Sequence, residues 1–249
     1  MSDSAGVPWE GRHFDHVASS DDDGSAPEKL IEAIRRFQAG DLGGADVVNA
    51  LRDSRLLIPL VAVLGEAGTN DGGQLVDKSQ ELSIVTVAGP DGRTVLPVFT
   101  SVTAMSKWNR TARPVPASAV RVALAAASEN TDLVVLDAGS VTEYVLRRPA
   151  VWAIAQSQPW IPSYEDEEVL GEFMAVAAPE TAVTSVQLAP GDRAARLTGP
   201  ELVVQLSLVE GLDSASLQAL MARLTARWSE STIIATRVDS MRVQLVGSA

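Results

Sequence analysis

The feature of this sequence that most limits its fold is a pair of strand-like segments separated by a tight-turn signal. Residues 81–88 (ELSIVTVA) and 93–100 (RTVLPVFT) flank the tetrapeptide GPDG at 89–92. An Asp-Gly step readily supplies the positive φ that tight turns need, so the two segments are predicted to form a hairpin. At least one sheet of this protein is therefore expected to contain antiparallel strands.

Helical segments alternate with further strand-like segments in the first part of the chain. The short apolar segments 56–64 (LLIPLVAVL) and 133–139 (LVVLDAG) predict buried strands, with Pro59 indicating an edge or a bulge in the first. Apolar residues recur at helical spacing after Pro27, and an alanine-rich helix is predicted at 117–128. Hairpin strands mixed with helices favour an α+β fold class.

A proline-containing acidic stretch at 159–180 is the best domain boundary in the chain. We therefore predict two small α+β domains, each a mixed or antiparallel sheet packed with helices, joined by an acidic linker. The predicted parts are a disordered acidic tail (1–24), a first domain (25–158), the linker (159–180) and a smaller second domain (181–249). In the second domain, strands are expected at 185–189, 201–209, 231–238 and 241–246, with an amphipathic helix beginning near Asp213.

The net charge of −12 is concentrated in two segments. Residues 1–26 hold six acids and one arginine, and residues 164–172 hold five acids and no base. An acidic chain repels phosphate, so nucleic acid is not expected as a partner. The apolar segment 56–64 is far shorter than the ~20 residues of a membrane span, and no secretory signal is evident at the start. A cytoplasmic protein without membrane contact is expected.

Cysteine is absent, which excludes thiolate nucleophiles, disulfides, iron–sulfur clusters and cysteine-ligated zinc. The two histidines, His13 and His16, lie in the predicted tail, and nearby Pro8 and Gly11 argue against the helix that would pair them as metal ligands. A Ser-His-Asp triad therefore cannot assemble in the folded part of the chain if the tail is disordered. No catalytic residue, metal or cofactor is predicted.

Asp137 is the carboxylate best placed for acid–base or ligand chemistry, because it ends a buried strand. The competing interpretation is an Asx-turn before Gly139, and it is favoured. The glycine-rich segment 65–73 lacks the spacing of a phosphate-binding loop. Arginine pairs such as Arg147-Arg148 could form an anion site, although solvated faces also need such residues.

The strand end and following helix at Phe99, Thr100, Ser101 and Trp108 form the candidate contact surface, because a helix N-terminus offers free amides. The alternative, rated at least equal, places Phe99 and Trp108 in the core and uses Thr100 or Ser101 only as a helix cap. Trp160, between two prolines, either pins the linker onto the first domain or offers an anchor to a partner. Trp152 is predicted to lie in the core.

Four segments resemble the SseB family, the bacterial enhanced serine sensitivity proteins. They are LPVFTS at 96–101, the helix that reaches Lys107-Trp108, LVVLDAGS at 133–140 and EYVLRRPAV at 143–151. The resemblance covers about residues 27–158, and a weaker one to the family's C-terminal domain follows. It implies an α+β cytosolic protein with no assigned reaction and no catalytic residues to carry over. The family's Asn-Pro or Asp-Pro turn is Asp137-Ala138 here.

The leading functional hypothesis is a non-enzymatic cytosolic module that binds a protein partner, and a homo-oligomer is possible. A sulfurtransferase that shares the family's name requires a cysteine, so that chemistry is excluded. The alternative hypothesis is a sensor of an amino acid or nucleotide, or a carboxylate-based hydrolase, with a pocket near Asp137.

Overall fold

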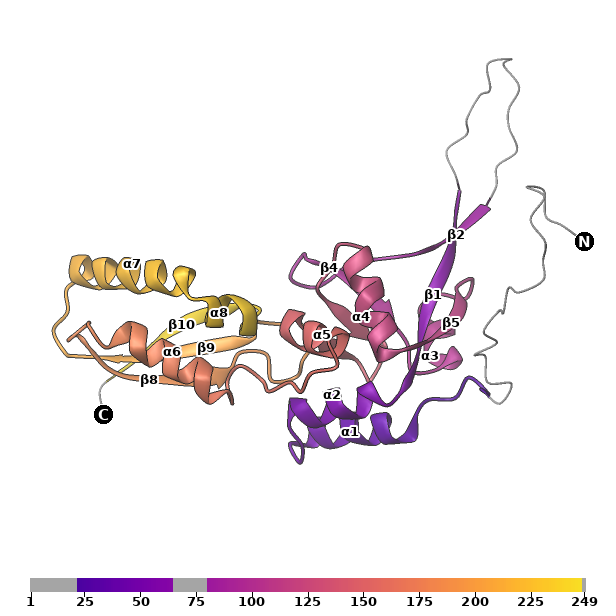
Figure 1. Cartoon of the computed structure of the whole chain (residues 1–249), viewed down its shortest axis with the longest axis horizontal. Coiled ribbons are helices and arrows are strands. Elements are labelled where there is room, and N and C mark those ends of the chain that lie inside the picture. The colour runs from indigo at the N-terminus through magenta and orange to yellow at the C-terminus, as the bar shows by residue number, and fades with distance from the viewer. Residues whose placement is uncertain (1–21, 65–79, 248–249) are drawn as a thin grey trace, which may run out of the picture.

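The computed structural model describes residues 22–64 and 80–247, and it has two lobes along its long axis (Figure 1). We call residues 22–64 and 80–158 the first unit and residues 167–247 the second unit. Residues 1–21 of the predicted tail lie outside the described residues, and so does the whole glycine-rich segment 65–73. Asp22 pairs with Arg55 at 2.9 Å, so the last tail residues contact the first unit.

The first unit contains five helices and seven strands in the described part of the chain. The helices are α1 (Glu28–Ala39), α2 (Gly44–Arg52), α3 (Val102–Trp108), α4 (Ala119–Ser128) and α5 (Arg148–Ala155). The strands are β1 (Arg55–Leu64), β2 (Gln80–Ile84), β3 (Val87–Ala88), β4 (Thr94–Val98), β5 (Arg113–Ser118), β6 (Val134–Leu136) and β7 (Tyr144–Leu146).

The predicted hairpin is present, but its first segment is shared between two sheets. β3 pairs antiparallel with β4, with Val87 opposite Val95, and these strands continue into β6 and β7 in the order β3-β4-β6-β7. β2 instead joins the antiparallel sheet β2-β1-β5. A bridge between Leu57 and Phe99 links the two sheets. The parallel pair β4-β6 makes the second sheet mixed, as an α+β fold allows.

Strand β5 was not predicted, because Pro114 and Pro116 interrupt its pattern. It lies at a sheet edge, where a missing N–H leaves no ladder partner unsatisfied. Pro59, expected at an edge or bulge, instead lies in the central strand β1, directly opposite Pro114.

The sheet β3-β4-β6-β7 is buried on both faces. One face packs against helices of the first unit in a core that includes Leu96, Val134 and Leu146. The other face carries Val95 and Val145, and Leu197 from the second unit covers it with only 3% of its surface exposed. The two units therefore share part of a core and are not independent of one another.

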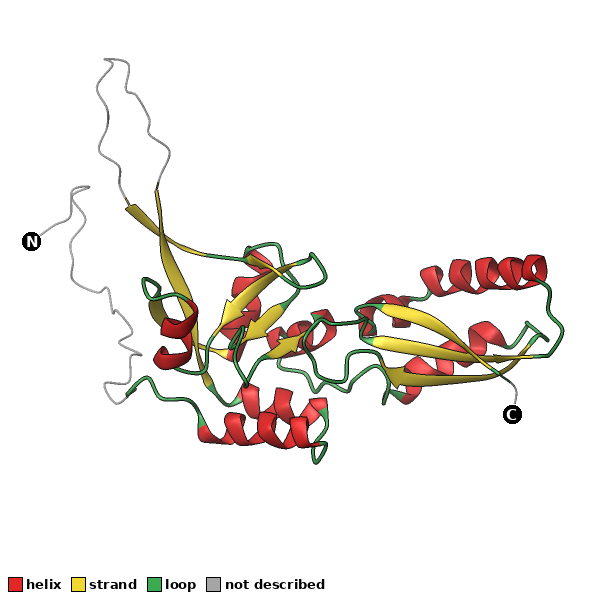
Figure 2. Cartoon of the chain, turned by 180° about the vertical axis from the view of Figure 1, so that it is seen from behind, coloured by secondary structure: helices red, strands yellow, loops and turns green. Residues whose placement is uncertain are grey.

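The second unit is a three-stranded sheet with three helices packed on one face. Its elements are α6 (Glu167–Ala177), β8 (Val183–Pro190), β9 (Leu202–Leu208), α7 (Ser214–Glu230), α8 (Thr232–Arg237) and β10 (Met241–Val246). The strand order is β10-β9-β8, with β10 parallel to β9 and β8 antiparallel to it. Phe173 and Trp228 meet edge to face in its core, with ring centroids 5.4 Å apart. Figure 2 shows the strands in front of α6.

Two expectations for this part of the chain need correction. Residues 167–177, which we assigned to the linker, form α6, whose Val169 and Phe173 are fully buried. Asp166 accepts hydrogen bonds from the first amides of that helix, so the acidic residues serve its N-terminus. Residues 232–237, expected as a strand, form α8, because Ser231 caps a new helix directly after α7.

In the described ranges, no helix combines the length and apolar character that a membrane span requires.

Candidate functional site

Five of the six residues singled out in the sequence lie together where β4 ends. Phe99 is fully buried beside Trp108, with ring centroids 5.2 Å apart. Ser101 caps α3 by accepting a hydrogen bond from the Ala104 N–H. Thr100 is 2% exposed. Phe99 and Thr100 therefore do not line an exposed contact surface, and the core-and-cap alternative describes this end of β4.

Asp137 is the polar centre of the same cluster. It is 1% exposed, and its carboxylate accepts three hydrogen bonds: from the Thr100 N–H at 2.8 Å, the Thr100 hydroxyl at 2.7 Å and the Thr142 hydroxyl at 2.7 Å. Its φ of +49° places it in the left-handed region, which starts the turn through Gly139. The carboxylate fixes two loops to each other, and its oxygens already have partners within the chain.

Trp160 lies apart from this cluster, at the junction of the two units. Its ring packs against the core of the first unit and lies near Gly44 of α2, where an added Cβ would be 3.6 Å from the indole. This contact matches the pinning interpretation. Its indole N–H is buried without a hydrogen-bond partner. The Arg52 guanidinium also holds the connection by donating to the Gln158 carbonyl.

A charged cluster joins the two units around Arg147, which is 7% exposed. Its guanidinium donates to Asp192 at 2.7 Å and to Asp239 at 3.1 Å, and also to the Gly199 carbonyl at 2.7 Å. Arg93 donates to both oxygens of Asp239, at 2.9 and 3.0 Å. We call Arg93, Arg147, Asp192 and Asp239 the Arg147 cluster. Arg147 is thus occupied by carboxylates of this chain and is not part of an anion site.

Sequence reasoning missed the acids of this cluster. Asp192 and Asp239 lie 45 and 92 residues after Arg147. No spacing rule connects residues so far apart, and each Asp sits in a turn-like sequence that gives no sign of burial.

The protonation of the Arg147 cluster follows from burial opposed by pairing. Burial alone would raise the pKa of Asp239, but hydrogen bonds and charge from Arg93 and Arg147 lower it below its usual range. Burial would also raise the pKa of Asp192, and hydrogen bonds from Arg147 and Thr198 lower it. Both carboxylates are therefore ionised at neutral pH.

Glu201 behaves in the opposite way to the two aspartates. Burial raises its pKa above the ordinary value, and the negative charge of Asp239 raises it further. Its carboxylate accepts the Asp239 N–H at 2.6 Å.

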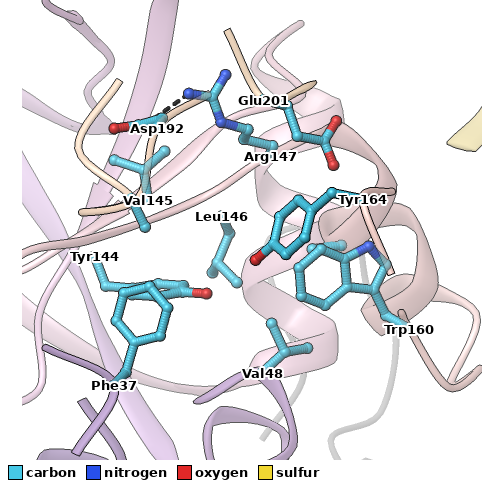
Figure 3. Close-up of a pocket in the computed structure, with 12 residues that line it drawn as sticks. Phe37, Val48, Tyr144, Val145, Leu146, Arg147, Trp160, Tyr164, Asp192 and Glu201 are labelled. Carbon is cyan, nitrogen blue, oxygen red and sulfur yellow. Dashed lines mark hydrogen bonds and ion pairs between the residues drawn. The ribbon is translucent and has the colours of Figure 1, made fainter. Parts of the chain in front are cut away.

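A small cavity of about 40 Å3 lies beside these residues, between the two units (Figure 3). The hydroxyls of Tyr144 and Tyr164 point into it from the two sides, and Val48, Leu146 and Trp160 close it. Burial raises the pKa of the Tyr164 hydroxyl to about 12 and that of Tyr144 as well, so both hydroxyls remain protonated donors. A buried water needs about 10–15 Å3, so the cavity has room for a few waters.

A larger groove of about 610 Å3 lies on the surface of the same junction. We call it the junction groove. It is lined by Pro149, Trp152, Ala153, Gln156, Gln158, Pro159, Trp160, Ile161, Asp166, Thr236 and Arg237. Trp152, expected in the core, is 39% exposed here, and Ile161 is 56% exposed. The prediction for Trp152 was wrong because polar partners hold its ring at the surface: Asp132 accepts its indole N–H, and Arg148 lies over the ring.

Acidic residues at the N-terminus of α6 adjoin the junction groove. Asp166 lines the groove, and Glu165 and Glu167, its neighbours in the chain, are exposed. The arginine in the groove, Arg237, pairs with Asp166 at 2.8 Å and with Glu168 at 2.5 Å. Its positive charge is therefore neutralised, and the net charge around the N-terminus of α6 is negative.

In the described residues, no group of three His, Cys, Asp or Glu side chains is arranged to hold a metal ion. His13 and His16 lie outside the described residues.

Searches of curated proteins and of solved structures find no match for this chain. A family model, described as the SseB protein N-terminal domain, matches residues 28–153. The matched range includes β4, β6, β7, α3 and most of α5, so it covers Thr100, Asp137 and Arg147. Because this match spans just over half of its residues, the chain belongs to the SseB family.

Proposed function

We propose that this protein is a non-enzymatic cytoplasmic module that binds a segment of a partner protein in the junction groove. The observation that carries the proposal is the exposure of two large apolar side chains, Trp152 and Ile161, in the lining of one groove. Exposed tryptophan is enriched among the residues that dominate binding energy at interfaces. A folded chain gains no stability from leaving these two apolar side chains in water.

The charge around the groove indicates the chemistry of the partner. Exposed Glu165 and Glu167 lie next to Asp166 in the chain, and the charge of Arg237 is matched by Asp166 and Glu168. Arg148 donates to the Ala235 and Val238 carbonyls and lies over Trp152, so it keeps its positive charge, but the acidic residues outnumber it. Complementary charge guides association and excludes partners of like sign. The expected occupant is therefore a short segment with apolar side chains and flanking lysine or arginine.

The non-enzymatic part of the proposal rests on the chemistry of the buried groups. Asp137, the best carboxylate for acid–base work, uses both oxygens to hold Thr100 and Thr142. A general base must be free to take a proton from a substrate within hydrogen-bond reach. Asp137 is better explained as a structural group.

The experiment measures binding of fluorescently labelled peptides by anisotropy. The first peptide carries leucines between lysines, and the second has glutamate in place of each lysine. The first is expected to bind more tightly, and its affinity is expected to fall about tenfold in Trp152→Ala and to weaken with added salt. Leu124→Ala is the matched control, because Leu124 is 56% exposed on α4, away from the groove.

Equal binding of the two peptides would remove the charge argument. Unchanged binding by Trp152→Ala, with the Leu124→Ala control also unchanged, would place the contact elsewhere and overturn the proposed groove. The double variant Glu165→Gln and Glu167→Gln separates the two contributions, because it is expected to reduce the salt dependence while Trp152 remains in place.

A second candidate function, sensing of a small molecule, is favoured by the cavity at Tyr144 and Tyr164. The hydroxyls of buried Tyr144 and half-buried Tyr164 point into it, and Tyr144 is held there by a long bond of 3.5 Å to the Gly44 carbonyl. Any ligand larger than a few waters requires the two units to separate slightly. A thermal-shift screen with serine and other amino acids tests this function. Saturable stabilisation that Tyr164→Phe abolishes would support it, and no shift with any of these amino acids would count against it.

A further inference from the structure

The two edges of the sheet in the second unit differ in how they are protected. β8 contains a register shift between Val183 and Ser185 and ends at Pro190. Bulges and prolines are devices that keep a sheet edge from pairing with another strand. β10, at the other edge, has neither proline nor lysine, and no bulge interrupts its six pairs with β9.

The outer side of β10 has no strand beside it in the described part of the chain. The Leu202 N–H donates to the Ser240 carbonyl, which sets the pattern of the parallel pair. Since backbone groups of alternate residues point to the same side, those of Met241, Val243 and Leu245 point away from β9. These residues offer a row of donors and acceptors to a further strand.

The side chains of β10 are apolar enough for a partner strand to cover. Leu245 is 46% exposed and Val246 is 40% exposed, although both lie in a regular strand. The only charged residue in β10 is Arg242. An exposed, unprotected edge of this kind is a site for strand addition.

We propose that two copies of this chain associate through their β10 strands, paired antiparallel about a two-fold axis at Gln244. The sheet would then continue through six strands. A two-fold interface must be complementary to itself, and this pairing satisfies that condition residue by residue. The proposal is independent of the junction groove, because no residue of β10 lines it.

The pairing centred on Gln244 places Val243 opposite the second copy's Leu245, so the apolar side of the sheet continues across the interface. It places Arg242 opposite Val246, which covers the second exposed apolar residue and brings no like charges together. Val243 and Leu245 are also the residues whose backbone groups point outward, as antiparallel hydrogen bonding requires.

The same pairing continues a row of glutamines. Gln187, Gln205 and Gln244 already lie side by side across β8, β9 and β10. Their side chains lie on the face opposite to the core residues Val204 and Leu206. A two-fold axis at Gln244 makes this a row of six amides, each able to donate to and accept from its neighbour.

A shift of the pairing to an axis at Arg242 is disfavoured, because it places the two Arg242 side chains directly opposite each other. A shift to an axis at Val243 places Val246 opposite Ser240, outside the strand, and pairs Gln244 with Arg242, which interrupts the glutamine row. Of these three axes, the one at Gln244 is therefore the axis that keeps Leu245 and Val246 within the paired strands, continues the glutamine row and brings no like charges together.

The absence of cysteine from the whole chain makes the experiment direct. Gln244→Cys introduces one thiol per chain, and the proposed axis places the two thiols at a non-hydrogen-bonded pair, where Cβ atoms lie about 4.5–5.5 Å apart and a disulfide forms with small adjustments. Gln187→Cys is the matched control, since it lies in the same glutamine row at the protected edge. Mild oxidation is followed on non-reducing gels, and the mass of the unmodified chain is measured by light scattering over a dilution series.

The expected result is a dimer that dissociates on dilution and a disulfide in Gln244→Cys but not in Gln187→Cys. Leu245→Lys, which adds a charge to the edge, is expected to raise the dissociation constant at least about tenfold while its circular dichroism stays unchanged. A monomer at every concentration, or equal cross-linking of the two cysteine variants, would overturn the proposal. A dimer that Leu245→Lys leaves intact would also overturn it, because the contact would then lie elsewhere.

Discussion

Thr100 donates both its backbone N–H and its hydroxyl to the carboxylate of Asp137, at 2.8 and 2.7 Å, across 37 residues of sequence. The contact joins the end of β4 to the end of β6, and it is buried. The two residues were singled out in the sequence as binding candidates. Their geometry makes them a fixed corner of the first unit, which positions the helix that carries Trp108.

Asp137→Asn tests this corner. Asn also tolerates a positive φ, so the substitution changes the carboxylate while the turn can remain. The NH2 group of the new asparagine takes the place of one carboxylate oxygen and faces a donor of Thr100 or Thr142, so at least one hydrogen bond is lost. The free energy of unfolding, measured by denaturant titration, is expected to fall by about 1–3 kcal/mol. Asp53→Asn, an exposed aspartate after α2, is the control and is expected to unfold as the unmodified chain does. Equal unfolding of both variants would show that the corner contributes little.

Arg147→Met tests the cluster between the units. The substitution removes the guanidinium that pairs with the buried carboxylates of Asp192 and Asp239. The free energy of unfolding is expected to fall by about 3–5 kcal/mol. The measurement is again denaturant unfolding, together with limited proteolysis of the connection at 156–166, which is expected to become faster. Arg196→Met is the control, because Arg196 is 40% exposed and lies 4.0 Å from Glu143.

The effect of Arg147→Met is also expected to depend on pH. The pKa values of Asp192 and Asp239 are lowered in the folded chain, so their contribution to stability is present above the unfolded pKa of about 3.9 and is lost as pH falls through the folded values. The difference between the variant and the unmodified chain should therefore shrink on acidification. A difference that stays constant with pH would indicate lost packing in place of lost pairing.

Glu201→Gln is expected to show the reverse dependence on pH. Burial raises the pKa of Glu201, so its contribution is fully present below the unfolded pKa of about 4.3 and is lost as pH rises through the folded value. Glutamine stays neutral, so the melting temperature of the variant should rise relative to the unmodified chain between about pH 4 and pH 7. Glu210→Gln, at an exposed position after β9, should show no such trend.

A pair of glycines is expected to respond to alanine in opposite directions. At Gly191 a Cβ would collide with the Pro200 carbonyl oxygen, where the two ends of the β8–β9 connection lie close together. Gly191→Ala should therefore lower stability by about 1–3 kcal/mol. At Gly171, inside α6, a Cβ meets nothing within 4 Å, and Gly171→Ala should raise stability by about 1 kcal/mol. Thermal unfolding of the two variants side by side measures both, and a loss in each would contradict the account of α6.

The elements that could be predicted from the sequence have a signal within a few neighbouring residues. The turn at 89–92 with its flanking strands and the amphipathic α7 after Asp213 follow from turn chemistry and periodicity alone. The SseB resemblance, carried by 96–101 and 133–151, agrees with the family match over residues 28–153. Local conformational preferences are sufficient to predict these elements, because the folded chain has the same conformation there that the short segments favour on their own.

Contacts between distant segments decided the other elements and the pairing of the buried charges. Proline-rich β5 is a strand only because β1 lies beside it, and α6 lies in a stretch that composition alone assigns to a linker. Arg147 contacts Asp192 and Asp239, which are 45 and 92 residues away in the sequence, only in the folded chain. The exposure of Trp152 depends on its contacts with Asp132 and Arg148. The sequence by itself determined the fold class and the family. Which charges are paired, and which apolar groups stay in contact with water, was decided by contacts between distant segments, because burial is a property of the whole packed chain and not of any short stretch.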